Sequence, residues 1–163
     1  MKKLLLSLFL AFAAFTVQAQ TYCTPSYSTG CATWGDDIDD VFIGTFQDTN
    51  TGCSTNNYMV ATGDPVDLSR GGYTSVSFTS NETTQWFAIW VDFNEDGDFD
   101  DSNEFIWSSS SNSWSGSVDS VLLPPTAPLG DYRMRIRSNF SARIQAGESC
   151  SSFSYGEVHD YTA

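Results

Sequence analysis

The sequence predicts an all-β fold, a single-domain β-sandwich of about eight strands and of the Ig-like or jelly-roll kind. Runs of Val, Ile, Phe, Tyr, Trp and Thr recur along the chain, and clusters of Gly, Pro, Asn and Ser separate them. After the first 19 residues, no window of useful length has apolar residues at helical spacing. The chain has 163 residues and no dividing linker, so it has the length of one ordinary domain.

The predicted strands are segments of β-branched and aromatic residues with turn residues at their ends. They are residues 40–46, 57–62, 73–79, 85–93, 104–108, 114–123, 131–138 and 155–162. Turn signals stand between them, for example Asn50-Thr51-Gly52, Arg70-Gly71-Gly72 and the segment 124–130. Short strands with such turns are typical of a sandwich.

The segment 85–93 has apolar side chains on both faces of the predicted strand. One face carries Phe87, Ile89, Val91 and Phe93, and the other carries Trp86, Ala88 and Trp90. A strand that is apolar on both faces is covered on both sides, so this segment is predicted to be a central strand.

The last two predicted strands carry rows of polar residues. In the segment 131–138 the apolar residues are predicted to point inward, and three arginines share the outer face: Arg133, Arg135 and Arg137. In the segment 155–162 another three residues share one face: Glu157, His159 and Tyr161. We expect that face to be a strand surface that pairs with the arginine row, because charged cross-strand pairs are ordinary in sheets.

The first 19 residues have the features of a signal peptide. Lys2 and Lys3 precede an apolar run from Leu4 to Val17, and the small residue Ala19 follows. That run is shorter than the roughly 20 residues of a membrane span, and no later segment is apolar enough to cross a membrane. We therefore expect a signal peptide at residues 1–19 and a secreted domain at residues 20–163, extracellular or at the cell surface and without membrane insertion.

Four cysteines follow the predicted signal peptide: Cys23, Cys31, Cys53 and Cys150. An even number of cysteines in an exported chain predicts two disulfides. Their spacing contains no C-x-x-C pair, which argues against a zinc site. Three pairings are open. A bond between Cys53 and Cys150, with Cys23 joined to Cys31, is favoured because it would tie the front of the domain to its last strand.

The charge of the chain argues against two classes of partner. The sequence has 20 Asp and Glu against 7 Lys and Arg, a formal net charge of -13. Such an acidic surface repels nucleic-acid phosphates and anionic lipid headgroups. Nucleic acids and membranes are therefore not expected as partners, whereas small cations are.

The acidic segment 92–104 has the oxygen pattern of a calcium-binding loop. The predicted Ca²⁺ ligands are Asp92, Asn94, Asp96, Asp98, Asp100 and Glu104. Gly97 at the sixth position allows a tight turn. The segment departs from an EF-hand, because Asn103 stands at position 12 and the flanks are predicted strands. The alternative is a solvated acidic turn, whose carboxylates would repel one another without a counter-ion.

Five motifs of this chain belong together. They are Tyr22-Cys23-Thr24-Pro25, Thr51-Gly52-Cys53, and the segments Trp90 to Phe99, Gly130 to Arg137 and Tyr155 to Thr162. In combination they resemble the GEVED domain family, over essentially the whole chain after the predicted signal peptide. The sequence departs from the family at His159, where the motif that names it has Glu.

This resemblance implies a β-rich accessory module of secreted, multidomain bacterial proteins, mostly from Bacteroidota. Such modules stand beside metalloprotease, hydrolase or adhesin-like domains. Because the sequence stops at Ala163, directly after the last predicted strand, a module that stands alone and a fragment of a longer protein are both open.

Enzymatic activity is not expected from this sequence. His159 is the single histidine, no Ser or Cys constellation accompanies it, and no H-E-x-x-H motif or nucleophile elbow appears. The function predicted is a noncatalytic module for binding, adhesion or spacing. Its expected partners are calcium and a glycan or a surface or matrix protein.

Two alternatives stay open. The first is a carbohydrate-binding module attached to a secreted hydrolase, because flat aromatic faces suit sugar rings. Trp107 and Trp114 flank the serine-rich segment 108–113 and are the predicted ligand-binding residues. The second is a cryptic hydrolase with two catalytic carboxylates, although the sequence marks out no particular pair.

Overall fold

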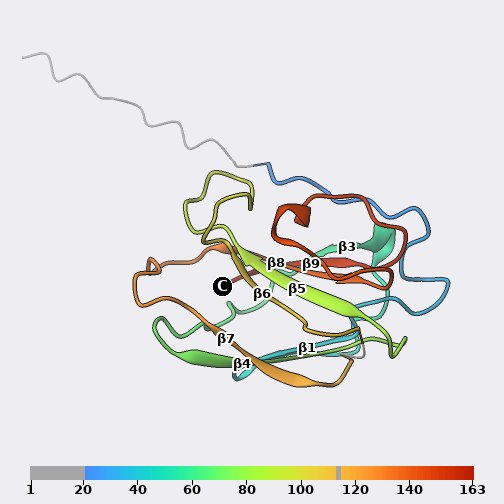
Figure 1. Cartoon of the computed structure of the whole chain (residues 1–163), viewed down its shortest axis with the longest axis horizontal. Helices are drawn as coiled ribbons and strands as arrows, with labels where there is room; N and C mark the ends of the chain where they lie inside the picture. Colours follow the sequence, from blue (N-terminus) through green and yellow to red (C-terminus); the bar gives the residue numbers. More distant parts are fainter. Residues whose placement is uncertain (1–20, 113–114) are drawn as a thin grey trace, which may run out of the picture.

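The computed structural model of the chain describes residues 21–112 and 115–163, which form two β-sheets that face each other (Figure 1). The predicted signal peptide at residues 1–19 and Trp114 lie outside the described residues. The first sheet has the order β2 (Phe46–Asp48), β1 (Asp40–Ile43), β4 (Tyr73–Thr79), β7 (Val118–Leu122). The second has the order β3 (Tyr58–Val60), β9 (Val158–Thr162), β8 (Arg133–Asn139), β5 (Trp86–Val91), β6 (Phe105–Ser108).

The predicted all-β sandwich is confirmed. Each predicted segment overlaps a strand, and the other regular elements described are the 3-10 turns η1 (Thr55–Asn57) and η2 (Ala146–Glu148). The segment 40–46 differs from its prediction as one strand. It forms the β1–β2 hairpin, because Gly44 has a positive φ of 58° and the chain reverses there, pairing Ile43 with Phe46.

Apolar side chains from both sheets fill the space between them. Phe78 of β4 and Phe87 of β5 stack with ring centroids 5.2 Å apart, which joins the two layers. The core also contains Ile38, Val41, Ile43, Val76, Ile89, Val91, Met134 and Ile136, all buried. This core supplies the principal driving force for folding.

The prediction that segment 85–93 is a central strand is confirmed. β5 lies between β8 and β6, and its second face is covered as well. There Trp90 packs with Phe99 and Ile144, and its Nε1 donates a hydrogen bond to the carbonyl of Ala146 at 2.9 Å. The five-stranded sheet is therefore covered by protein on both faces over β5.

The arginine row lies on the outer face of β8, as predicted, but two of its members are buried. Arg135 and Arg137 have no exposed surface. Arg135 donates to both carboxylate oxygens of Asp160 at 2.8 Å and to the carbonyl of Cys23 at 2.9 Å. Arg137 donates to the Tyr27 hydroxyl at 3.1 Å and to the carbonyl of Ser151 at 2.9 Å. These contacts satisfy charges that burial would otherwise penalise.

The expected pairing of Glu157, His159 and Tyr161 with the arginine row is wrong. The register of β8 with β9 places His159 opposite Ile136 and Tyr161 opposite Met134, on the face that looks toward the other sheet. The residue of β9 that pairs with Arg135, and at 3.9 Å with Arg133, is instead Asp160. Strand parity groups residues on one face, but the fold decides which face is the inner one.

The favoured disulfide pairing is also wrong. The bonds are Cys23–Cys150 and Cys31–Cys53, with Cα atoms 6.0 Å and 5.5 Å apart. Arg135 brings the first pair together, because its guanidinium donates to the carbonyls of both Cys23 and Ser149. Within residues 21–112 and 115–163, no helix is both apolar enough and long enough to cross a bilayer.

Candidate functional site

The acidic segment 92–104 is a closed loop that connects β5 to β6. Its two ends meet, because the backbone N–H of Val91 donates to the carbonyl of Glu104 at 2.9 Å and that of Phe93 donates to Glu104 Oε1 at 3.2 Å. Asp92 and Glu104 have no exposed surface, although both carry carboxylates. The structure therefore brings together the first and last of the predicted calcium ligands at the base of the loop.

Asp92 organises the first turn of the loop. Its Oδ1 accepts from the backbone N–H of Glu95 at 2.7 Å, and its Oδ2 accepts from that of Gly97 at 3.1 Å. The hydroxyl of Tyr22 donates to the same Oδ2 at 2.7 Å. Glu95 and Gly97 have positive φ angles of 58° and 95°, so the tight turn expected at Gly97 is present.

The predicted ligands in the middle of the loop lie exposed at its rim. Each side-chain oxygen accepts the backbone N–H two residues further on: Asn94 from Asp96 at 3.1 Å, Asp96 from Asp98 at 3.2 Å, and Asp98 from Asp100 at 2.9 Å. These are consecutive Asx turns. The alternation that suggested ligand positions therefore also shapes the backbone of the loop.

The electrostatics of the loop are unfavourable for the ionised form of Glu104. Burial raises the pKa of Glu104 to about 7, and repulsion by Asp92 and Asp101 adds to that effect, while backbone N–H groups oppose it. The close ion pairs of the described residues involve Asp160 and Glu157, and none involves a loop carboxylate. In the side-chain positions of this structure, the described residues contain no group of three or more His, Cys, Asp or Glu that could hold a metal ion.

The last motif of the chain surrounds a second buried carboxylate. Glu157 Oε2 accepts from the backbone N–H of Ile38 at 2.9 Å, and Oε1 accepts from that of Ser54 at 2.6 Å. His159 is fully buried, with Nε2 3.3 Å from Glu157 Oε1 and Nδ1 3.1 Å from the Tyr161 hydroxyl. The motif therefore links β9 to the segments before β1 and β3.

The comparison with family models gives a match over these elements. The GEVED domain model matches residues 86–163, from β5 through the acidic loop to the final motif. This segment of the chain is a GEVED domain. Neither the curated proteins nor the solved structures gave a match.

The GEVED segment does not fold around itself alone. β3 pairs with β9, and β4 pairs with β7, so strands that precede the match complete both sheets. The boundary predicted at residue 20 stays a prediction.

The tryptophan predicted to face a ligand within the GEVED segment lies in the core. Trp107 is 8% exposed, its ring lies 5.7 Å from that of Phe78, and its Nε1 donates to Asp119 Oδ2 at 2.9 Å. The register that pairs Trp107 with Ile89 turns it inward. The surface patch predicted for Trp107 is therefore wrong, and its expected partner Trp114 lies outside the described residues.

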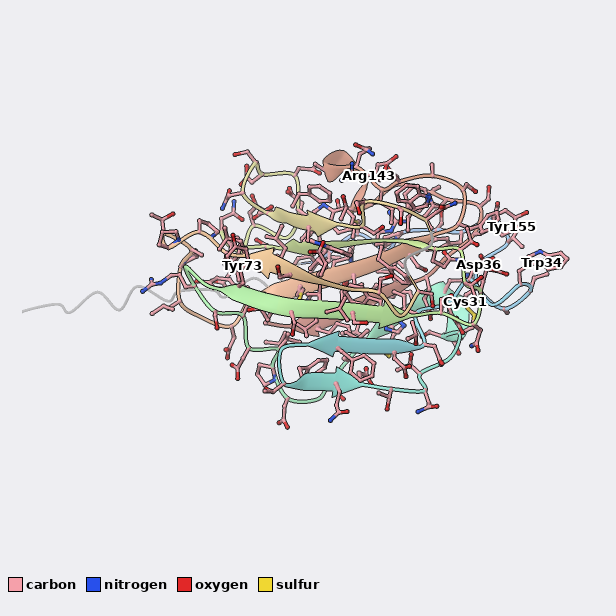
Figure 2. All side chains as sticks on the ribbon, turned by 60° about the horizontal axis from the view of Figure 1, so that its bottom comes forward. Cys31, Trp34, Asp36, Tyr73, Arg143 and Tyr155 are labelled. Carbon is pink, nitrogen blue, oxygen red and sulfur yellow. A yellow bond between two sulfur atoms is a disulfide. The ribbon has the colours of Figure 1, made fainter. Side chains whose placement is uncertain are left out.

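A pocket that the sequence did not reveal lies at one end of the molecule. It has a volume of about 280 Å³ and is lined by Trp34, Asp36, Glu82, Phe140 and Tyr155. Figure 2 shows Trp34 projecting at this end, with Asp36 and Tyr155 nearby. These residues come from segments up to 121 positions apart in number, from Trp34 to Tyr155, so no local motif marks them. The local signal was a tryptophan in the turn 31–35.

Proposed function

We propose that this chain is a secreted, noncatalytic β-sandwich module that serves binding, adhesion or spacing and is stabilised by calcium. Membership of the GEVED family supports the accessory role. The observation that carries the calcium part is the pair of fully buried carboxylates, Asp92 and Glu104, at the base of an otherwise acidic loop. Burial and the neighbouring carboxylates disfavour the ionised form of Glu104, and a bound cation would reduce that penalty.

The loop residues that would hold the ion are those of the sequence prediction: Asp92, Asn94, Asp96, Asp98, Asp100 and Glu104. Their chemistry fits Ca²⁺, which prefers carboxylate and amide oxygens. Their side chains accept hydrogen bonds from the loop's own backbone, so binding would require the rim residues to turn toward the ion. The ion would supply positive charge that lets Glu104 stay ionised at neutral pH.

Two observations support the absence of catalysis and the secreted location. The histidine that could act as a base, His159, is fully buried between Glu157 and Tyr161 and cannot reach a bulk substrate without opening the sheet. Two disulfides are typical of proteins in oxidising compartments, in agreement with the predicted signal peptide.

Thermal unfolding with and without calcium tests the proposal. A ligand at 100 times its dissociation constant stabilises the folded state by about 2.7 kcal/mol. For a domain of this size we expect the melting temperature in excess calcium to exceed that in chelator by about 5–10 °C. An unchanged melting temperature, or an equal rise with magnesium, would contradict a calcium site.

A matched pair of variants makes this test specific. In Asp96→Asn/Asp98→Asn, the amide oxygens keep the Asx turns but two negative charges are lost, so most of the calcium-dependent rise should disappear. In chelator this variant should melt no lower than the wild type, because repulsion is reduced. Asp64→Asn, an exposed carboxylate outside the loop, should keep the full calcium effect.

The carbohydrate-binding alternative loses one of its two predicted residues, because Trp107 is buried. It now depends on Trp114. Binding of a glycan panel to the wild-type chain and to Trp114→Ala would test it. The hydrolase alternative would be supported if the purified protein hydrolysed a polymeric glycan.

A further inference from the structure

The pocket at the Trp34 end of the molecule combines aromatic faces with carboxylates. Trp34 comes from the turn after Cys31, Glu82 from the β4–β5 turn, Phe140 from the residues after β8, and Tyr155 from the segment before β9. The acidic loop 92–104 contributes no residue to the lining of this pocket, so the pocket is a separate site.

The aromatic side chains are presented to solvent. Trp34 is 67% exposed and Phe140 is 42% exposed, although large aromatic side chains gain free energy from burial. Phe140 packs edge-to-face against Tyr155 with ring centroids 6.0 Å apart, which fixes two of the three rings. The Phe140 ring is thus both exposed and held in place, and with the exposed Trp34 ring it is available for contact with a ligand.

The turn that carries Trp34 is held rigidly. Cys31 is bonded to Cys53, and its carbonyl accepts from the backbone N–H of Gly35 at 3.0 Å and from that of Asp36 at 3.2 Å. The carbonyl of Gly35 in turn accepts from the N–H of Glu82 at 2.7 Å, which sets Glu82 beside this turn. The backbone of this turn therefore loses little conformational entropy when a ligand binds.

The two carboxylates of the pocket repel each other. Asp36 is 2% exposed, and its Oδ1 accepts from Gln85 Nε2. Burial raises the pKa of Asp36, and the neighbouring charges of Glu82 and Asp37 raise it further. None of the described residues that line the pocket is basic. The negative charge here is therefore left without a cation from the pocket itself.

We propose that this pocket binds one organic cation, a guanidinium or alkylammonium group. The aromatic faces would attract the cation, and Asp36 and Glu82 would neutralise it. A neutral sugar would leave the carboxylate repulsion in place. The volume of about 280 Å³ suits a group the size of one side chain rather than an oligosaccharide. The net charge of -13 also draws cations toward the protein.

This cation has two sources with the same chemistry, a free small molecule and an arginine or lysine side chain of a partner protein. The site goes beyond the proposed calcium-stabilised module. The calcium experiment does not bear on it, and the binding experiment described next does not bear on the calcium loop.

Titration of the full chain with arginine analogues tests the pocket. The probes are N-acetylarginine amide and its neutral isostere N-acetylcitrulline amide, followed by NMR through the indole N–H signal of Trp34. We expect the arginine probe to bind about tenfold more tightly than the citrulline probe, as cation–π and charge contacts require. Equal binding of the two probes, or shifts at Trp34 with a neutral glycan and none with arginine, would overturn the proposal.

Variants locate the binding at these residues. Trp34→Ala and Glu82→Gln should each weaken arginine binding about three- to tenfold. Tyr73→Ala is the control, because Tyr73 is 72% exposed and lies toward the other end of the molecule (Figure 2). It should bind as the wild type does. Unchanged affinity in Trp34→Ala, with an unchanged melting temperature, would overturn the proposal.

A peptide with one arginine between neutral residues distinguishes the two sources. Affinity about tenfold above that of the single amino acid indicates a partner side chain, since flanking contacts then contribute. Affinity equal to that of the amino acid indicates a free cation. Both results support a cation pocket, whereas binding of neither probe contradicts it.

Discussion

Glu157 is a fully buried carboxylate that joins three separate segments of the chain. Burial opposes its ionisation, but the contact with His159 and the N–H groups of Ser54 and Ile38 outweigh that effect and lower its pKa. A residue that gives the family motif its second letter therefore acts as a structural acceptor for backbone groups. A buried carboxylate with these donors is better explained by folding than by catalysis.

Replacing Glu157 by Gln should destabilise the protein by about 2–3 kcal/mol in urea unfolding at neutral pH. The amide keeps the shape but places an NH₂ group against a backbone N–H donor. Because the pKa of Glu157 in the folded protein lies below its ordinary value of 4.5, the stabilisation is present above that pH and is lost as pH falls through the folded pKa. The difference between wild type and variant should therefore shrink below about pH 4.5.

Asp64→Asn is the control for this comparison, because Asp64 is exposed. Asp64→Asn should change the free energy of unfolding by less than about 0.5 kcal/mol, both at neutral pH and below about pH 4.5. A Glu157→Gln protein as stable as the wild type at neutral pH would show that the backbone donors find other acceptors.

The sequence predicted the positions of some single residues and not of others. The alternating oxygens of the acidic loop are a local pattern, so the sequence could locate this loop between two strands, β5 and β6. Its calcium ligands stay a prediction. Trp107 was misplaced, because a tryptophan beside a serine-rich turn looks the same whether its ring points in or out. Its pairing with Ile89 decides that question, and pairing is not a local property.

At the scale of elements, β9 depends on the sharp turn before it. Gly156 has a φ of 124°, and a Cβ at this position would meet the backbone carbonyl of Ser138 on β8. The hydroxyl of Ser138 also accepts from the backbone N–H of Glu157 at 2.9 Å. The glycine of the motif thus lets the two strands approach closely enough for β9 to pair with β8.

Gly156→Ala should therefore cost about 2–4 kcal/mol, from backbone strain and from the clash with Ser138 together. Chemical unfolding followed by near-UV circular dichroism measures it. Gly147→Ala is the matched control, because Gly147 has a φ of -80° and open space around its Cβ position. Equal stabilities of the two variants would contradict this role for Gly156.

The strand positions were predictable because β-propensity and turn residues are read over a few neighbours. β4 was placed at residues 73–79, as observed, and the central position of β5 followed from its two apolar faces. The inward face of β9 was not predictable. It carries polar residues, and only its register with β8 shows that they look toward the core.

At the scale of the whole molecule, the two disulfides close loops of very different length. Cys23–Cys150 spans 127 residues and Cys31–Cys53 spans 22. On the chain-entropy relation these bonds stabilise the fold by about 5 and about 3.4 kcal/mol. The longer loop ties the N-terminal segment over the outer face of β8, where it covers Arg135.

We expect Cys23→Ala/Cys150→Ala to be less stable than Cys31→Ala/Cys53→Ala by about 1.5 kcal/mol in urea unfolding. Loss of the long bond should also expose Arg135 and speed exchange of the β8 amides. Mass spectrometry of a non-reduced digest checks the pairing directly. A peptide joining Cys53 to Cys150 would contradict the structure, and so would an order of stabilities opposite to the expected one.

The sequence alone determined the all-β class, the strand positions and the acidic loop, and its resemblance to the GEVED family agrees with the match over residues 86–163. These features depend on patterns among near neighbours. The tertiary structure decided the disulfide pairing, the burial of Arg135 and Arg137, the inward face of β9 and the pocket around Trp34. Each of these depends on register and on contacts between distant segments, which no local pattern encodes.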